Sequence, residues 1–370
     1  MLTRLFIKKP TLARVKAVLD KEDFIYTDKD VEDILKGNQK GVRYGSTILV
    51  RNEDGEKQKR FIKLPLDGKW ETHQLFRRQV KVTYALQENK AFRDSTIAIV
   101  KASLAGPIPY AIFETRENGD NFGFMYDTPE SYDTLTEQDV RRLVRVIYSF
   151  HHSGLSMDKK ELSGTRDISS RLRHYTDECK KVLDKKIKHR YQDGSEIETT
   201  VEKLLVHYTK ISDLRERILK LLQKNWAPIS SSRITKGSYL VNADMQIDNV
   251  YKNKNGNFEF FDLEWVGRTD DPAIAIMYDY GYLRARAWFS PSFQSFLDEA
   301  MREIGLESYK NPAMIGAALK LGVIRSSLNL SRYHLDVVNT LKNGKRTEEQ
   351  YRDMYSKTIA TLTEAITTGK

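Results

Sequence analysis

The sequence predicts an α+β chain in two lobes, with an antiparallel sheet in a small N-terminal lobe and mainly helices in a larger lobe. Three observations support this prediction. Short apolar runs separated by turn residues fill much of residues 1–126, helical spacing of apolar residues dominates residues 127–370, and one hairpin interrupts the helical part. We therefore expect residues 1–126 to form the small lobe and residues 127–370 to form the large lobe.

The composition is that of an ordinary soluble protein, because 40% of the 370 residues are hydrophobic and 30% are charged. Cys179 is the single cysteine, which excludes an internal disulfide and fits a reducing compartment, so we expect a cytoplasmic protein. The most apolar of the longer stretches, Thr96–Phe113, is broken by Lys101, Pro107 and Pro109. We therefore expect no membrane span.

The net charge of +10 favours anionic partners, and ATP is one of them. The same charge would also suit weak attraction to nucleic acid or to a membrane surface. No zinc-knuckle, RNP-type or helix-turn-helix signature occurs in the sequence, so we expect no dedicated nucleic-acid module.

The N-terminal part predicts a helix followed by three strands. The apolar residues of Thr11–Asp20 fall on one helical face, with Thr11 as the N-cap. We expect strands near Val31–Leu35, over Arg43–Arg51 and over Arg60–Leu64. Asp54-Gly55 is a favourable hairpin pair between the last two strands.

A second helix and a further hairpin complete the predicted small lobe. Thr72–Leu86 is amphipathic with a helical period. Tyr110–Arg116 and Asn121–Tyr126 flank a turn that contains Asn118-Gly119. Lys63 stands at the end of the third predicted strand, where a solvated lysine is the ordinary alternative to a functional one.

Helical patterns dominate after Thr136, which we expect to cap a helix that ends near His152. Two long helices are predicted over Ile168–Tyr191 and Ile197–Leu222, and Asp193-Gly194 lies in the segment that joins them. The C-terminal part predicts further helices over Ala273–Trp288, Ser290–Ile304, Pro312–Asn339 and Glu348–Thr367.

The stretch from Tyr239 to Pro272 gathers side chains suited to chemistry around one hairpin. Two apolar runs, Ile247–Tyr251 and Phe258–Leu263, flank Asn255-Gly256. An Asn-Gly pair accepts the positive φ values of a type I′ turn, so this is a strong hairpin signal.

The hairpin is expected to bring Asn249, at the base of one strand, near Asp262, at the end of the other, with Asp244 in the preceding loop. Carboxylate and amide oxygens suit Mg²⁺, and the remaining Asp could hold a hydroxyl that attacks a phosphate. The alternative is that Asp244 and Asn249 are ordinary turn residues and Asp262 merely ends a strand. The joint spacing and the hairpin favour the functional interpretation.

The pattern Asp-x-x-x-x-Asn, followed by a hairpin and a second Asp eighteen residues after the first, is similar to the catalytic core of kinases. The continuation Phe261-Asp262-Leu263-Glu264-Trp265, and then Asp270-Asp271-Pro272, resembles the aminoglycoside phosphotransferase and choline kinase superfamily. That superfamily shows His-Gly-Asp-x-x-x-x-Asn, then Ile-Asp-Trp-Glu, then Gly-Asp-Pro. The resemblance implies a two-lobed, protein-kinase-like fold, and its specific part is residues 240–272.

The resemblance also implies a role for each matching residue. Asp244 is the catalytic Asp, and Asn249 and Asp262 are the metal ligands. Lys63 pairs the α- and β-phosphates of the nucleotide. Gln79, sixteen residues after Lys63, stands where the superfamily has the Glu that orients this lysine.

Three further residues are expected at the hinge between the lobes. By the resemblance, Phe124, Met125 and Asp127 lie at the end of the last strand of the small lobe and contact adenine, mainly through backbone groups. The alternative for Phe124 and Met125 is a packing role at the end of a strand.

These observations predict an ATP- and Mg²⁺-dependent phosphotransferase that moves the γ-phosphate to a hydroxyl of a small molecule. The rival is a pseudokinase-like nucleotide-binding or scaffold protein with little turnover. The rival rests on Asn242 and Ala243 in place of the usual His and Gly, on the neutral Gln79, and on the irregular glycines Gly37, Gly41 and Gly45. The intact Asp244, Asn249 and Asp262 favour the enzyme.

Overall fold

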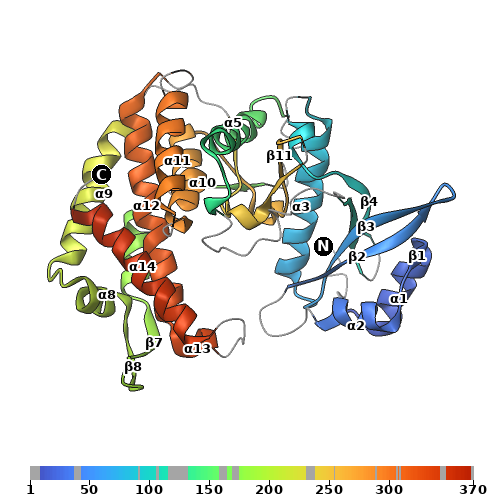
Figure 1. Cartoon of the computed structure of the whole chain (residues 1–370), viewed down its shortest axis with the longest axis horizontal. Helices are drawn as coiled ribbons and strands as arrows, with labels where there is room; N and C mark the ends of the chain where they lie inside the picture. The colour runs from blue at the N-terminus through green and yellow to red at the C-terminus, as the bar shows by residue number, and fades with distance from the viewer. Residues whose placement is uncertain are drawn as a thin grey trace, which may run out of the picture. The chain divides into compact units, whose positions relative to one another are not determined.

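The computed structural model of the chain describes residues 9–36, 43–90, 92–105, 108–115, 132–157, 165–168, 175–230, 238–253, 255–287, 290–305, 307, 310–341 and 347–367 (Figure 1). The chain divides into two compact units. Unit 1 comprises Met1–Asp120, Met157–Thr165 and Lys252–Val266, and unit 2 comprises Asn121–Ser156, Arg166–Tyr251 and Gly267–Lys370. The predicted lobe boundary at residue 126 falls in the segment 116–131, outside the described residues, and stays a prediction.

Unit 1 is built on one antiparallel sheet of five strands in the order β1-β2-β3-β5-β4 (Figure 1). Its strands are β1 (Phe24–Ile25), β2 (Tyr44–Glu53), β3 (Glu56–Pro65), β4 (Ile99–Ser103) and β5 (Tyr110–Glu114). The predicted hairpin at Asp54-Gly55 is confirmed, since both residues have positive φ between the paired Glu53 and Glu56, as a two-residue type I′ turn requires. The strand predicted over Asn121–Tyr126, which was expected to pair with Tyr110–Arg116, lies outside the described residues.

Helices cover both faces of this sheet. Even-numbered residues of β3 and β5, such as Ile62 and Ile112, share a core cluster with Val15 and Leu19 of α1 (Leu12–Lys21). Odd-numbered residues of β5 pack instead against α3 (Trp70–Glu88), which confirms the helix predicted over Thr72–Leu86. Because side chains alternate along a strand, Lys63 of β3 is placed on the α3 face.

The strand predicted near Val31–Leu35 is wrong, because this segment lies in the helix α2 (Asp28–Lys36). Val31 and Ile34, three residues apart, are the buried pair of one helical face. Thr27 and Asp30 bond reciprocally at the start: the backbone N–H of Thr27 donates to Asp30 Oδ2 at 2.7 Å, and that of Asp30 donates to Thr27 Oγ1 at 3.3 Å. This capping box was a helix signal in the sequence.

Unit 2 is mainly helical. Thr136 caps α5 (Glu137–Ser153) in a capping box with Asp139, which confirms the cap predicted at this position. The helices predicted after Pro272 are also found as α10 (Pro272–Arg286), α11 (Pro291–Ile304), α12 (Pro312–Leu335), α13 (Val337–Leu341) and α14 (Glu348–Thr367) (Figure 1). The single helix predicted over Pro312–Asn339 is divided at Asp336 into α12 and α13. The buried α12 packs against both α10 and α14.

The two long helices predicted over Ile168–Tyr191 and Ile197–Leu222 are wrong in their central part. Helix α7 (Tyr175–Leu183) is followed by a hairpin of β7 (Lys186–Arg190) and β8 (Glu196–Thr200), and then by α8 (Val201–Thr209) and α9 (Leu214–Ser230). The hairpin turns at Gly194, whose φ is +85°. Asp193-Gly194 was therefore a hairpin signal rather than a break between helices.

Helices α10 and α12 cross at two glycines. A Cβ atom added to Gly322 of α12 would lie 2.3 Å from the backbone oxygen of Met277, and one added to Gly281 of α10 would lie 2.5 Å from the Cα of Gly322. The absence of side chains at both positions lets the two backbones approach closely.

Gly322→Ala should destabilise the protein by about 1–3 kcal/mol, because overpacking at a backbone contact outweighs the better helix propensity of alanine. Gly316→Ala is the matched control on the same helix, since an added Cβ there meets nothing within 4 Å. It should be neutral or stabilising by up to about 1 kcal/mol. Equal effects of the two variants in urea unfolding would contradict the close crossing.

Three short strands and a hairpin carry the predicted functional stretch. Strand β12 (Gly267–Thr269) pairs in parallel with β6 (Arg166–Asp167) and antiparallel with β9 (Tyr239–Val241). The predicted hairpin is present as β10 (Val250–Lys252) with β11 (Phe258–Phe260).

The turn of this hairpin differs from the predicted type I′ turn. Gly256 has a φ of +76°, the Gly256 N–H donates to the Asn253 carbonyl at 2.8 Å, and the Asn253 N–H donates to the Asn257 carbonyl at 2.8 Å. The ends of the predicted strands are 3₁₀ turns, η4 (Ile247–Asn249) and η5 (Leu263–Trp265).

Within the described ranges, none of the helices combines the length and the apolar character that a bilayer span requires.

Candidate functional site

Lys63, Gln79 and Asp262 meet in unit 1. The ammonium Nζ of Lys63 lies 2.7 Å from Asp262 Oδ1 and 3.0 Å from Gln79 Oε1. The lysine is 4% exposed, so it is not the solvated strand-end residue that was the alternative. Strand β3 supplies the lysine, α3 supplies the glutamine, and η5 begins directly after the aspartate.

Aromatic packing of Phe261, the residue directly before Asp262, holds Asp262 in place. The ring of Phe261 lies edge-on to Phe61 at 5.2 Å and to Phe113 at 5.5 Å between ring centroids, which places the end of the hairpin on the sheet. Asp262 itself has a φ of +55°, a region that Asp and Asn tolerate better than most residues.

Two further residues complete this cluster, and neither of them was among the predicted site residues. The Lys63 ammonium lies 4.3 Å from the centroid of the Tyr44 ring. Glu264 is 8% exposed, and burial together with the neighbouring Asp262 carboxylate raises its pKa. Glu264 lies within the Asp-Leu-Glu-Trp stretch that carries the resemblance. Tyr44 was predicted only to be part of a strand.

In unit 2, the loop after β9 is held by a buried aspartate of α10. Asp279 accepts hydrogen bonds from the backbone N–H groups of Asn242, at 2.9 Å, and Ala243, at 2.8 Å. Its Oδ2 is also 2.9 Å from Nε2 of His151, and the side chains of His151 and Asp279 are fully buried. This anchor sets the backbone path immediately before Asp244. No sequence signal marks this anchor, because Asp279 is an ordinary helical aspartate far along the chain.

Asp244 and Asn249 meet within the same loop. The Asn249 amide nitrogen donates to the Asp244 carbonyl at 3.0 Å and approaches Asp244 Oδ2 at 3.4 Å. Both partners are acceptors, so the amide must present its N–H₂ group to Asp244 and keep its oxygen on the other side. An amide oxygen is a suitable ligand for Mg²⁺.

Asn242 and Ala243, the two residues that depart from the superfamily pattern, lie directly before Asp244. Ala243 has a φ of +61°, a conformation that glycine adopts without strain. Asn242 is fully buried, and neither its side-chain oxygen nor its side-chain nitrogen has a hydrogen-bond partner among the described residues. The loop therefore keeps a glycine-like path with an alanine in it.

The predicted site residues thus form two groups. Lys63, Gln79 and Asp262 are together in unit 1, and Asp244 and Asn249 are together in unit 2. A metal site shared by Asn249 and Asp262 stays a prediction, because these residues belong to different units. The expected adenine contacts Phe124, Met125 and Asp127 lie in the segment 116–131, outside the described residues.

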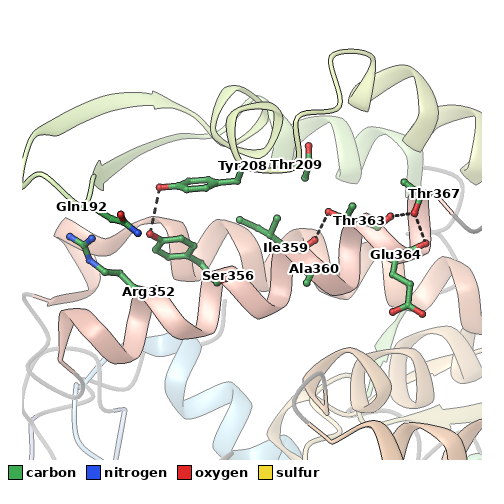
Figure 2. Close-up of a pocket in the computed structure, with 11 residues that line it drawn as sticks. Gln192, Tyr208, Thr209, Arg352, Ser356, Ile359, Ala360, Thr363, Glu364 and Thr367 are labelled. Carbon is green, nitrogen blue, oxygen red and sulfur yellow. Dashed lines mark hydrogen bonds between the residues drawn. The ribbon is translucent and has the colours of Figure 1, made fainter.

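Unit 2 also has a groove of about 680 Å³ along α14, opposite the end of α8 (Figure 2). Tyr208 lies toward the end of the groove with Gln192 and Arg352 (Figure 2), and its hydroxyl is 3.5 Å from the hydroxyl of Tyr355, another lining residue. The groove contains none of the predicted site residues, so it has no part in the chemistry considered below.

Neither a protein-family model nor a curated protein matches this sequence. Solved structures do resemble the fold. A spectinomycin phosphotransferase in complex with ADP and spectinomycin is similar with a TM-score of 0.53 and 12% identity, over 95% of this chain and 98% of that chain. The AMP-bound complex of spectinomycin phosphotransferase has a TM-score of 0.51 and 10% identity, over 90% and 97% of the two chains.

An aminoglycoside phosphotransferase from Alicyclobacillus acidocaldarius is similar with a TM-score of 0.50 and 12% identity, over 87% of this chain and 90% of that chain. Structural similarity at identities this low establishes the fold and leaves the activity open. The predicted α+β fold is confirmed, and it is the fold of these phosphotransferase structures.

Proposed function

We propose that this protein is an ATP- and Mg²⁺-dependent phosphotransferase that moves the γ-phosphate to a hydroxyl group of a small molecule. The observation that carries the proposal is the buried contact of Lys63 with Asp262 at 2.7 Å and with Gln79 at 3.0 Å. The resemblance implies that Gln79 stands beside Lys63 and that Lys63 and Asp262 act on the same nucleotide, so the contact of these three residues supports it. Similar folds hold ADP with spectinomycin in one solved structure and AMP in another.

The donor set suits the metal that this reaction needs. Asp262 offers a carboxylate whose side chain is 30% exposed, and Asn249 offers an amide oxygen because its nitrogen is committed to Asp244. Mg²⁺ is commonly held by one or two such groups together with phosphate oxygens and water. When bound, the metal would neutralise charge on the phosphates.

In this proposal, Lys63 steadies the nucleotide phosphates by its positive charge, and Asp244 orients the acceptor hydroxyl and accepts its proton. Asn249 donates to the backbone carbonyl of Asp244 and approaches its carboxylate, and Asp279 binds the backbone N–H groups of the two preceding residues. Phosphoryl transfer depends mainly on positioning and on charge stabilisation, so rigid support of Asp244 matters as much as its basicity.

The rival proposal is a nucleotide-binding or scaffold protein with little turnover. It would rest on the neutral Gln79 and on the unpartnered side chain of Asn242. Against it stands the ordered support of Asp244 by Asn249 and, through the loop backbone, by Asp279. A protein without turnover has no need to position this carboxylate.

The first test is metal-dependent nucleotide binding. Mg²⁺ with ATP at about a hundred times the dissociation constant should stabilise the wild-type protein by about 2.7 kcal/mol, which is measured as a rise in melting temperature. EDTA should remove most of the rise. Asp262→Asn should also remove the Mg²⁺-dependent part, and since Asn adopts positive φ readily, the protein should still fold.

Asp298→Asn is the matched control, because it removes one carboxylate from a half-exposed ion pair with Arg284 in α10. It should leave the response to Mg²⁺ and ATP unchanged. A wild-type melting temperature that ignores millimolar ATP in the presence of Mg²⁺ would count against both the enzyme and the nucleotide-binding rival.

A further inference from the structure

Lys63 occupies an unusual electrostatic position. Its side chain is 5% exposed, so its charge is nearly removed from water. The helix residue that faces it, Gln79, offers a carbonyl oxygen at 3.0 Å but no charge. Asp262 is its one carboxylate partner within 4 Å among the described residues. Asp262 is also the proposed metal ligand. A second residue is therefore needed to hold the lysine when the Asp262 carboxylate binds a metal.

The ring of Tyr44 is placed to supply that second element. The Lys63 ammonium lies 4.3 Å from the centre of the ring, well within the range of a cation–π contact. Phe261 is a more distant aromatic neighbour at 5.7 Å. A cation–π contact is strongest where water is excluded, and both Tyr44 and Lys63 belong to the interior face of the sheet beside α3.

The orientation of the Tyr44 ring is itself fixed from several directions. Its hydroxyl donates to the backbone carbonyl of Thr72 at 3.4 Å, and burial together with the charge of the neighbouring Glu264 raises the pKa of Tyr44. Its ring packs against Phe76 at 6.0 Å between centroids. The ring is therefore tied to α3 and η5, the elements on either side of the lysine.

We propose that Tyr44 is a positioning residue that holds Lys63 in place of the missing helix glutamate. The ring attracts the ammonium without adding a negative charge, so the full positive charge of Lys63 remains for an anionic ligand. A carboxylate at position 79 would hold the same ammonium through an ion pair. The proposal rests on the proposed function for the identity of that ligand, which is the phosphate chain of a nucleotide.

The contact itself can be tested without any ligand. In protein labelled with ¹³C-lysine, with Lys63→Arg used to assign the signal, the ε-methylene protons of Lys63 should be shifted upfield by the ring current of Tyr44. Tyr44→Phe should keep the upfield shift because the ring remains. Tyr44→Leu should move the signal to the ordinary lysine position.

The matched control is Tyr84→Leu, because Tyr84 is a tyrosine of the same unit that lies on α3 and is 38% exposed. It should leave the Lys63 signal upfield. Should the Lys63 signal be ordinary in the wild type, or unchanged in Tyr44→Leu, the contact is absent and the proposal is overturned.

The consequence for binding is tested by calorimetric titration with Mg²⁺ and ATP. Tyr44→Leu should weaken affinity about tenfold, the size expected for a desolvated cation–π contact, whereas Tyr84→Leu should change it less than threefold. Gln79→Glu should restore most of the affinity in the Tyr44→Leu background while changing the otherwise wild-type protein little. A merely structural role of Tyr44 would not be rescued by a charge on α3.

The outcomes separate this inference from the proposed function. If the wild type binds no nucleotide but its Lys63 signal depends on Tyr44, the proposed function fails and the contact stands, without the nucleotide role. If the wild type binds nucleotide and Tyr44→Leu binds equally well, or its loss is not rescued by Gln79→Glu, the positioning role of Tyr44 is wrong.

Discussion

Asp244→Asn should slow phosphoryl transfer by about 10²–10⁴-fold, the usual scale for a positioned general base. The substitution keeps the size of the side chain and leaves the backbone carbonyl that accepts from Asn249 in place. Affinity for Mg²⁺ and ATP should stay nearly constant, because the proposed metal ligands are Asn249 and Asp262. Slow hydrolysis of ATP, which needs no knowledge of the acceptor, is the readout, followed as phosphate release under saturating nucleotide.

Asp270→Asn is the control for this variant, since it removes the same charge from an exposed position next to the start of α10. Its turnover should match that of the wild type. Equal turnover of wild type and Asp244→Asn, in a preparation that does hydrolyse ATP, would show that Asp244 is not the catalytic residue.

Asp279→Ala should lower the free energy of unfolding by about 3–5 kcal/mol, because it leaves one buried backbone N–H, one partly buried backbone N–H and the buried His151 without their shared acceptor. The loop before Asp244 would lose its anchor as well. Turnover should therefore fall even under conditions in which the variant remains folded, and urea unfolding and ATP hydrolysis are measured on the same samples.

Two companion variants sharpen this result. Asp279→Asn keeps one acceptor oxygen but presents an N–H₂ group to the remaining donor, so its loss of stability should be intermediate. Asp298→Ala removes a half-exposed ion pair with Arg284 and should cost at most about 1 kcal/mol. An Asp279→Ala protein as stable as Asp298→Ala would contradict the anchoring role.

The parts of the fold that the sequence predicted are those in which local signals agree. The β2–β3 hairpin follows from alternating apolar residues and Asp54-Gly55, and the C-terminal helices follow from long apolar stripes. The sixteen-residue step from Lys63 to Gln79 also held, because a strand, a short connection and a helix of ordinary geometry bring the two side chains together.

The errors arose where a short segment carried two competing signals. Val31 and Ile34 suit a strand by composition, but the reciprocal bonds of Thr27 and Asp30 begin a helix. Asp193-Gly194 suits a break between helices, but the residues on either side pair as strands. In both cases the turn or cap residues, and not the apolar pattern, decided the structure.

Part of the candidate site could not be predicted from spacing at all. Asp279 lies 37 positions after Asn242 on a helix whose residues are nearly all buried, so no local pattern marks it. Tyr44 faces Lys63 only because β2 and β3 pair in a particular register and α3 covers that face. Tertiary packing creates these contacts, and a motif made of neighbouring residues does not contain them.

The central claim is transfer of the γ-phosphate from ATP to a hydroxyl, and the most direct measurement is a ³¹P NMR screen for phosphorylated products. The wild-type protein, Mg²⁺ and ATP are incubated with a panel of hydroxyl compounds that includes aminoglycosides, other antibiotics, sugars and amino alcohols. We expect a new phosphate-ester signal with at least one acceptor, dependent on Mg²⁺ and strongly reduced in Asp244→Asn. Binding of Mg²⁺ and ATP with no phosphate ester on any acceptor, and no ATP hydrolysis, would contradict the enzyme and favour the nucleotide-binding scaffold.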